Sequence, residues 1–124
     1  MNNGTKLFLS TLGYGKEKAK NAHALYLEHK LAGGVEKLSI FQRLLRIYAS
    51  DARKCKIKVV GDNDGYYIAK DDAEWEEYTR TQLNSVYSKI VSIAMCEGKT
   101  VSQIIRKKLS GKKVTDTEQQ LSFF

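Results

Sequence analysis

Proline is absent from this chain, and the sequence holds no apolar run long enough to cross a membrane. The first absence excludes collagen-like and polyproline segments. The run Leu7-Phe8-Leu9 is too short for the core of a secretion signal. Cysteine is scarce as well, since Cys55 and Cys96 are isolated thiols without C-x-x-C spacing. Both fall on apolar helical stripes, so we expect core thiols in a cytoplasmic protein.

Signatures of catalysis are also missing, and we expect no enzyme activity, no cofactor and no metal site. His23 and His29 are six residues apart, which does not place them on one helical face as a metal pair requires. Gly15-Lys16 lacks the first glycine and the Ser or Thr of a phosphate loop. Val60 stands where an EF-hand begins with aspartate, so the segment after it is predicted to be a plain turn.

Positive charge is what the chain has in excess. It carries 21 Lys and Arg against 14 Asp and Glu, which gives a net charge of +7. Residues 1–58 hold 12 basic and 4 acidic groups, residues 59–98 hold 3 and 8, and residues 99–124 hold 6 and 2. This distribution favours a polyanionic partner such as nucleic acid, bound mainly by the first half. A solvated basic surface without a partner is the alternative.

Two helices separated by a glycine turn are predicted in the first half. The segments 16–20 and 22–32 are expected to be helical, and Gly33-Gly34 supplies the stop. Ser39 followed by Gln42 predicts a capping box for the next helix. That helix has one apolar face, at alternating spacings of three and four, formed by Leu38, Phe41, Leu45, Tyr48, Ala52 and Cys55.

A hairpin and two further helices are predicted after it. The extended runs 56–60 and 66–69 are joined by Gly61-Asp62-Asn63-Asp64-Gly65, which is typical of a β-turn. Asp71-x-x-Glu74 opens a long helix that continues to Glu97 and stops at Gly98. Its apolar stripe comprises Trp75, Leu83, Val86, Ile90 and Ile93. Thr100 with Gln103 predicts a capping box for a short helix that ends at Leu109.

The order helix, turn, helix and hairpin is that of a winged helix-turn-helix, and we expect a mostly α fold of this kind with a small β-hairpin. The expected organisation is a DNA-binding domain over residues 1–70, a long and a short helix for packing or oligomerisation over 71–109, and a flexible tail over 110–124. Arginines on the second helix would approach base edges or phosphates. The predicted DNA-binding residues are Arg43, Arg46, Ser50, Arg53, Lys54, Lys56 and Lys58.

Three segments resemble a family of small phage-encoded winged helix-turn-helix proteins usually found near replication genes. They are Leu12-Gly13-Tyr14-Gly15-Lys16-Glu17-Lys18-Ala19, then Arg43-x-x-Arg46-Ile47 with Ala52-Arg53, then Gly65-Tyr66-Tyr67-Ile68-Ala69. The resemblance covers about residues 12–95 and implies DNA binding more firmly than a particular task. The connection from Gly33 to Leu38 is longer than the turn of that family, which leaves the helix angle and the groove open.

The end of the sequence resembles another motif, the pentapeptide by which bacterial replication and repair proteins bind the DNA polymerase sliding clamp. Its usual form is Gln-Leu-Ser/Asp-Leu-Phe, and one position departs from it here. In this interpretation the glutamine is the hydrogen-bonding anchor, and the leucine and last phenylalanine fill apolar pockets. The alternative is a tail that folds back onto its own domain. The predicted clamp-binding residues are Gln120, Leu121, Ser122, Phe123 and Phe124.

The sequence therefore predicts a viral or mobile-element DNA-binding protein that docks on the host sliding clamp and modulates DNA replication in the bacterial cytoplasm. One alternative is a host-takeover or anti-defence inhibitor that acts by protein-protein binding. Another is a transcriptional regulator that dimerises through the long helix. Residues 94–109 also look like part of a ribbon-helix-helix repressor, but residues 72–81, where that fold needs a strand, are predicted to be helical.

Overall fold

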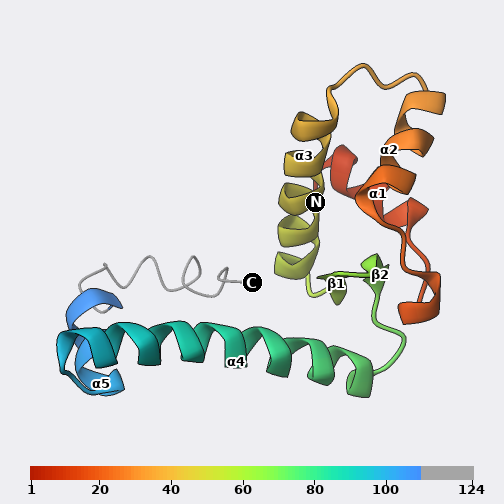
Figure 1. Ribbon diagram of the computed structural model, residues 1–124. Coiled ribbons are helices and arrows are strands. Elements are labelled where there is room, and N and C mark those ends of the chain that lie inside the picture. Colours follow the sequence, from red (N-terminus) through yellow and green to blue (C-terminus); the bar gives the residue numbers. More distant parts are fainter. Residues whose placement is uncertain (110–124) are drawn as a thin grey trace. The chain divides into compact units, whose positions relative to one another are not determined.

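The computed structural model describes residues 1–109 and divides the chain into two compact units (Figure 1). The N-terminal unit comprises residues 1–76, and the C-terminal unit begins at residue 77. The predicted fold class is confirmed, since the described residues are mostly helical with a two-stranded antiparallel hairpin. In chain order the elements are α1 (Asn3–Thr11), the 3-10 turn η1 (Lys16–Lys18), α2 (Ala22–Leu31), α3 (Leu38–Lys54), β1 (Val59–Asp62), β2 (Gly65–Ile68), α4 (Asp72–Glu97), α5 (Val101–Ile104) and the π-helical turn η2 (Ile105–Leu109).

Helix α1 is an element that the sequence pattern did not predict. Asn2 caps it, because its side-chain oxygen accepts a hydrogen bond from the backbone amide of Thr5 at 2.7 Å. Phe8 is buried on the inner side of the helix. The fully buried Thr5 hydroxyl donates to a carboxylate oxygen of Asp51 in α3, also at 2.7 Å. Apolar packing of Phe8 and Leu9 in the core and the hydrogen bond between Thr5 and Asp51 thus dock α1 on the rest of the unit.

Helix α2 agrees with its predicted range to one residue at its end. Asn21 caps its start by accepting from the amide of Ala24 at 2.8 Å. It ends at Gly33, whose φ of 95° lies in the left-handed region that favours glycine. The helix expected over 16–20 is only a 3-10 turn, because Lys20 forms an antiparallel bridge with Tyr66 instead.

Helix α3 has the buried face that the spacing predicted, but two details were wrong. Helix α3 begins at Leu38, and its N-cap is Lys37, which makes no side-chain hydrogen bond there. The expected capping box of Ser39 and Gln42 therefore does not form. Cys55 is exposed because α3 ends before it, and Cys96 is exposed on α4. Neither cysteine is therefore a core thiol.

The core of the N-terminal unit lies between its three helices and the start of the hairpin (Figure 1). Burying one large apolar side chain contributes about 1.5–3 kcal/mol, so these contacts hold the helices together. The buried cluster consists of Phe8, Leu12, Leu25, Phe41, Leu45, Ala49, Ala52 and Val59.

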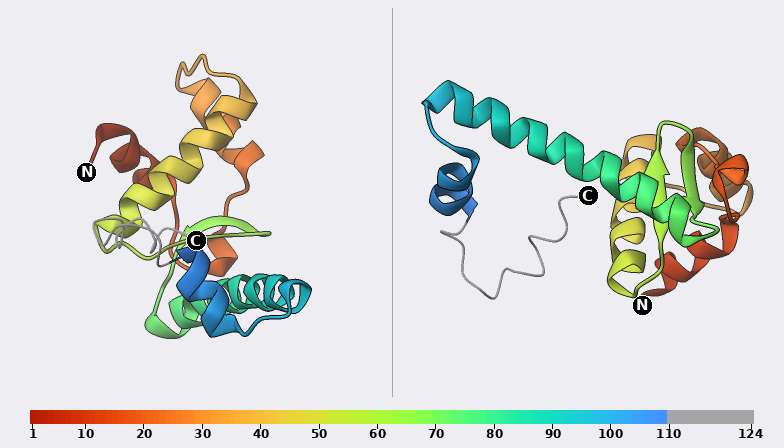
Figure 2. Two further views of the ribbon diagram at one scale, coloured as in Figure 1. Left: turned by 90° about the vertical axis from the view of Figure 1, so that its left-hand side faces the viewer. Right: turned by 90° about the horizontal axis from the view of Figure 1, so that it is seen from below.

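The hairpin is tighter than expected, because its strands reach further into the glycine- and aspartate-rich segment. Val59 pairs with Ile68 at one end and Asp62 pairs with Gly65 at the other, which leaves a two-residue turn. The other edge of β2 pairs with residues 13–20, through bridges that include Tyr14 with Ile68. Figure 2 shows the hairpin following directly on the end of α3. A helix-turn-helix is thus succeeded by a wing-like ribbon, as predicted.

Helix α4 has the predicted length and ends at Gly98, whose φ is 68°. Its apolar stripe is less buried than the sequence suggested: Leu83 and Ile93 are 53% and 42% exposed, whereas Tyr78 and Ala94 are buried. The capping box of Thr100 and Gln103 in front of α5 is confirmed.

Candidate nucleic-acid interface

Helix α3 turns a basic surface away from the core. Arg43 and Arg46 are both exposed, on the side opposite the buried Phe41 and Leu45. Asp51 is the sole acidic residue of α3, and it is engaged by the Thr5 hydroxyl. That hydrogen bond is the main cause that lowers the pKa of the Asp51 carboxyl. The outward face of α3 therefore presents arginines without an acidic side chain among them.

The C-terminal end of α3 extends this surface by an unusual backbone turn. The amide of Lys56 donates to the carbonyl of Arg53 at 2.9 Å, and the amide of Ile57 donates to that of Ala52 at 3.0 Å. This is a Schellman motif, and its left-handed position is occupied by Lys56 with a φ of 68°. Lys54 and Lys56 are both exposed. A lysine thus stands where glycine is the preferred residue.

The remaining predicted DNA-binding residues are less available than the arginines. Arg53 is half-buried, and its Nε donates to the carbonyl of Val59 at 2.9 Å, which ties α3 to β1. Ser50 is also half-buried. Lys58 pairs with Asp72 at 2.7 Å, and this contact holds the pKa of the Asp72 carboxyl below its usual value. The structure therefore brings Arg43, Arg46, Lys54, Lys56 and Lys58 to solvent, although Lys58 is paired with Asp72, and it ties Arg53 to the backbone of β1.

The tip of the hairpin is acidic rather than basic. Asp62 and Asp64 are both exposed, and Lys16 lies 3.4 Å from Asp64. Burial raises the pKa of the Tyr67 phenol to about 12, and the charge of Asp62 adds to this effect. A phosphate backbone is repelled by carboxylates. The favourable surface is consequently the α3 side of the motif and not the tip of its wing.

Two isoleucines on the same face were not anticipated as functional residues. Ile40 is 49% exposed and Ile47 is 48% exposed. They alternate with Arg43 along α3, so the outward face combines apolar and basic side chains. The sequence spacing could have indicated them, because positions 40, 43, 47 and 50 follow one another at intervals of three or four residues and therefore share one face of the helix, as the buried positions do. Such a face can contact thymine methyl groups or an apolar partner surface.

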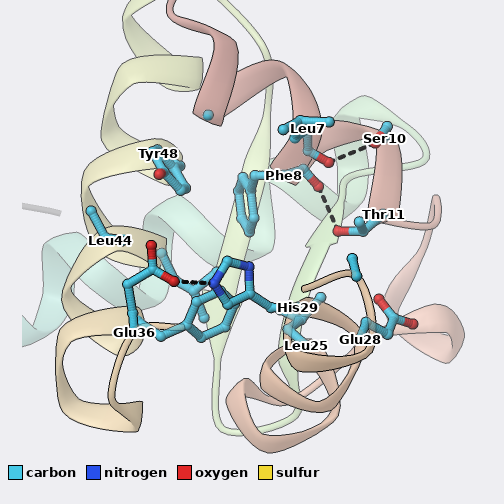
Figure 3. A pocket seen from close by; sticks show the side chains of 14 residues that line it. Leu7, Phe8, Ser10, Thr11, Leu25, Glu28, His29, Glu36, Leu44 and Tyr48 are labelled. Carbon is cyan, nitrogen blue, oxygen red and sulfur yellow. Dashed lines mark hydrogen bonds and ion pairs between the residues drawn. The ribbon is translucent and has the colours of Figure 1, made fainter. Parts of the chain in front are cut away.

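A cavity of about 240 Å³ lies between α1, α2 and α3 (Figure 3). The side chains of His29 and Glu36 point toward one another at its border and are hydrogen-bonded, and this hydrogen bond is the main cause that lowers the pKa of the Glu36 carboxyl. The His29 ring also stacks on Phe41 with 4.6 Å between ring centroids. The walls are mainly apolar, with Leu7, Phe8, Leu25, Leu44, Leu45 and Tyr48 among the lining residues.

Within residues 1–109 no group of three or more His, Cys, Asp or Glu side chains is placed to hold a metal ion. None of the described helices combines the length and the apolar character that a bilayer crossing requires. The predicted clamp-binding peptide, residues 120–124, lies outside the described residues.

Comparisons of this chain with protein-family models, with curated proteins and with solved structures give no match.

Proposed function

We propose that this chain is a phage or mobile-element DNA-binding protein that docks on the bacterial DNA polymerase sliding clamp through residues 120–124. The observation that carries the DNA half is the outward face of α3, where Arg43 and Arg46 are exposed and the helix's one carboxylate, Asp51, is hydrogen-bonded to the Thr5 hydroxyl. Arginine forks suit both phosphates and guanine edges, so this face is chemically equipped for duplex DNA.

Lys56 supports the same proposal. A non-glycine residue in the left-handed region costs about 1–2 kcal/mol, and such strain tends to persist at functional positions. The lysine at this site adds an exposed ammonium group at the end of the basic face. The presence of lysine where glycine would be less strained is explained if that charge contacts a phosphate.

The test of DNA binding is a titration of duplex DNA at several salt concentrations. The double variant Arg43→Gln/Arg46→Gln should bind more weakly by about 1–3 kcal/mol for each specific base interaction that it removes, or show a smaller salt slope if the arginines bind phosphates. Lys6→Gln/Lys30→Gln removes the same charge from α1 and α2 and serves as the control. Binding that is equally weak in both variants, or independent of salt, would contradict the proposal.

The clamp half rests on the sequence of residues 120–124 alone. A pull-down with purified sliding clamp should recover the full chain but not a form that ends at Glu118. Leu121→Ala/Phe124→Ala should abolish recovery, because these side chains fill the apolar pockets. Ser122→Asp is the matched control, since the motif accepts either residue at that position. Equal recovery of all forms would remove the clamp from the proposal.

A second copy of this chain is the partner we propose for α4. Leu83, Val86, Ile90 and Ile93 form a seam with the three-four spacing of a coiled coil, and part of it is exposed. An antiparallel copy would place Leu83 against Ile93 and Val86 against Ile90, and residues 77–97 contain two acidic and two basic side chains. Light scattering during size-exclusion chromatography should show a dimer for the natural chain and a monomer for Ile90→Asp.

One observation favours the alternative of an inhibitor that binds a host protein. Ile40 and Ile47 expose apolar surface beside the arginines, as protein interfaces often do. The variant Ile40→Ser/Ile47→Ser separates the two hypotheses, because it should abolish binding to a protein partner but leave the salt slope of DNA binding, which reports phosphate contacts, unchanged. A transcriptional regulator would instead give an ordered footprint on DNA without retention by the clamp.

A further inference from the structure

Three lysines gather around a single carboxylate at the end of α4, within the C-terminal unit. The Nζ of Lys108 is hydrogen-bonded to Glu97, and the Nζ of Lys107 lies 3.9 Å from the other carboxylate oxygen. The hydrogen bond from Lys108 is the main cause that lowers the pKa of the Glu97 carboxyl, and the charges of Lys107 and Lys99 add to it. We call Lys99, Lys107 and Lys108 the lysine cluster.

The backbone of this region explains why lysines that lie eight or nine residues apart in sequence meet. Gly98 reverses the chain in the left-handed conformation, and the amide of Lys99 donates to the carbonyl of Ala94 at 2.9 Å. Thr100 then caps α5, and the turn η2 returns Lys107 and Lys108 toward the end of α4. The cluster is therefore built by a defined turn and not by chance contacts of long side chains.

Among the described residues, the positive charge of the cluster exceeds the negative charge of the carboxylate with which it pairs, Glu97. A side-chain hydrogen bond with Lys107 is the main cause that lowers the pKa of Lys99, and the positive charge of Lys107 adds to it. One carboxylate cannot compensate three ammonium groups. The side chains of Lys107 and Lys108 remain 58% and 46% exposed, so an anion from solvent can reach both.

We propose that the lysine cluster binds the phosphodiester backbone of duplex DNA, as a contact separate from the face of α3. This inference rests on the proposed DNA-binding function and extends it to the C-terminal unit. Phosphate oxygens would supply the missing negative charge that Glu97 supplies only in part. Lysine is a compact point charge without the fork that reads base edges, so the cluster adds affinity without sequence preference.

The experiment measures duplex DNA binding by the full chain across a series of NaCl concentrations. Each lysine-phosphate contact releases counterions that steepen the logarithmic salt slope by about 0.9. The triple variant Lys99→Gln/Lys107→Gln/Lys108→Gln should therefore reduce the slope by about 2–3. Circular dichroism of each variant verifies that its helices are retained.

Two matched variants isolate the cluster from a general effect of charge. Lys6→Gln/Lys30→Gln/Lys89→Gln removes three exposed lysines elsewhere and should leave the slope close to that of the natural chain. Glu97→Gln removes the competing carboxylate and should strengthen binding at every salt concentration. A merely structural role of Glu97 would instead weaken binding together with folding.

The outcomes distinguish this inference from the function on which it rests. If the natural chain binds DNA, Arg43→Gln/Arg46→Gln weakens it, and the cluster variant behaves like its control, the inference alone is overturned. Salt-independent or absent DNA binding overturns both. If inorganic phosphate binds the natural chain more tightly than the cluster variant while the two proteins have equal DNA salt slopes, the cluster holds free phosphate and its assignment to DNA is wrong.

Discussion

The backbone amide of Ile57 donates to the carbonyl of Ala52 at 3.0 Å, and this hydrogen bond closes the turn in which Lys56 has the left-handed conformation. The same pattern ends α2 at Gly33 and α4 at Gly98, where glycine occupies the corresponding position. Three helices of the described chain thus end in the same Schellman motif. In α3 alone of these three, the left-handed position is occupied by a residue with a β-carbon, Lys56. The lysine is therefore less favourable for the backbone at this position than glycine would be, and under the proposed function its side chain contacts a DNA phosphate.

Lys56→Gly is predicted to stabilise the N-terminal unit and to weaken DNA binding. Relief of the left-handed conformation contributes about 1–2 kcal/mol, and the greater freedom of glycine in the unfolded chain offsets about 0.4–1 kcal/mol. The net gain of roughly 0.5–1 kcal/mol is measurable as a higher urea midpoint with an unchanged slope. DNA affinity should fall because one ammonium is removed.

Lys56→Gln separates these two effects. It keeps the β-carbon in the left-handed region and removes the charge, so stability should stay the same while DNA affinity falls as in the glycine variant. If both variants bind DNA as the natural chain does, Lys56 does not contact phosphate, whatever happens to stability.

Most elements of the fold follow from local sequence signals, and the exceptions have identifiable causes. Glycine stops and the apolar spacing of α3 depend on residues close in sequence, so they were predictable. Helix α1 was missed because its stability comes from burial of Phe8 and from the bond between Thr5 and Asp51, which are 46 residues apart. Long-range contacts of this kind leave no periodic pattern in a nine-residue helix.

The exposed arginines of the candidate site were predictable from the sequence, but the ion-pair partners of its lysines were not. Helical spacing alone places Arg43 and Arg46 on the solvent side of α3. The ion pair of Lys58 with Asp72 depends on how the hairpin leads into α4, and no local pattern contains that information. The same holds for the lysine cluster around Glu97, which requires the chain reversal at Gly98.

Asp51 is predicted to make the free energy of unfolding fall at acidic pH. Its folded pKa lies below the ordinary value of 3.8, so its contribution is fully present above that value and is lost as the pH falls through the lowered pKa. Asp51→Asn still accepts the hydrogen bond from Thr5 but cannot take up a proton. Urea unfolding at neutral and acidic pH should therefore show a smaller acid-induced loss for this variant than for the natural chain.

Two variants of Thr5 verify the cause. Thr5→Val removes the hydroxyl at nearly constant volume, and the acid-induced loss should shrink as it does in Asp51→Asn. Thr5→Ser keeps the hydroxyl and should preserve the full loss. An acid dependence that is identical in all four proteins would show that this pair does not control it.

Position 34 is predicted to require glycine, because the ring of His29 leaves no room for a β-carbon there. A β-carbon on Gly34 would overlap Nε2, Cδ2 and Cε1 of that ring, which stacks on Phe41 and pairs with Glu36. Gly34→Ala should therefore lower the free energy of unfolding by about 1–3 kcal/mol, as overpacking does. In the background His29→Ala the same change should cost little, because the obstructing ring is gone.

Gly33→Ala is the control for this cycle. A β-carbon there meets open space, but the φ of 95° is unfavourable for alanine, so its effect should be the same with or without the His29 ring. If Gly34→Ala and His29→Ala are simply additive in urea unfolding, close approach to the ring is not the reason for glycine at position 34.

Tyr67 is predicted to link stability to alkaline pH. The residue is 3% exposed, and its burial raises the pKa of the phenol from 10.0 to about 12. Because the unfolded chain releases this proton first, the contribution of Tyr67 is fully present below pH 10 and is lost as the pH rises toward 12. Tyr67→Phe should lose less stability across this interval than the natural chain, whereas Tyr14→Phe, which alters an exposed ring, should lose as much. Asp62→Asn should reduce the loss in part, since it leaves the burial and removes the neighbouring charge. Equal alkaline losses in the natural chain and in Tyr67→Phe would mean that ionisation of this phenol does not control the stability of the hairpin at high pH.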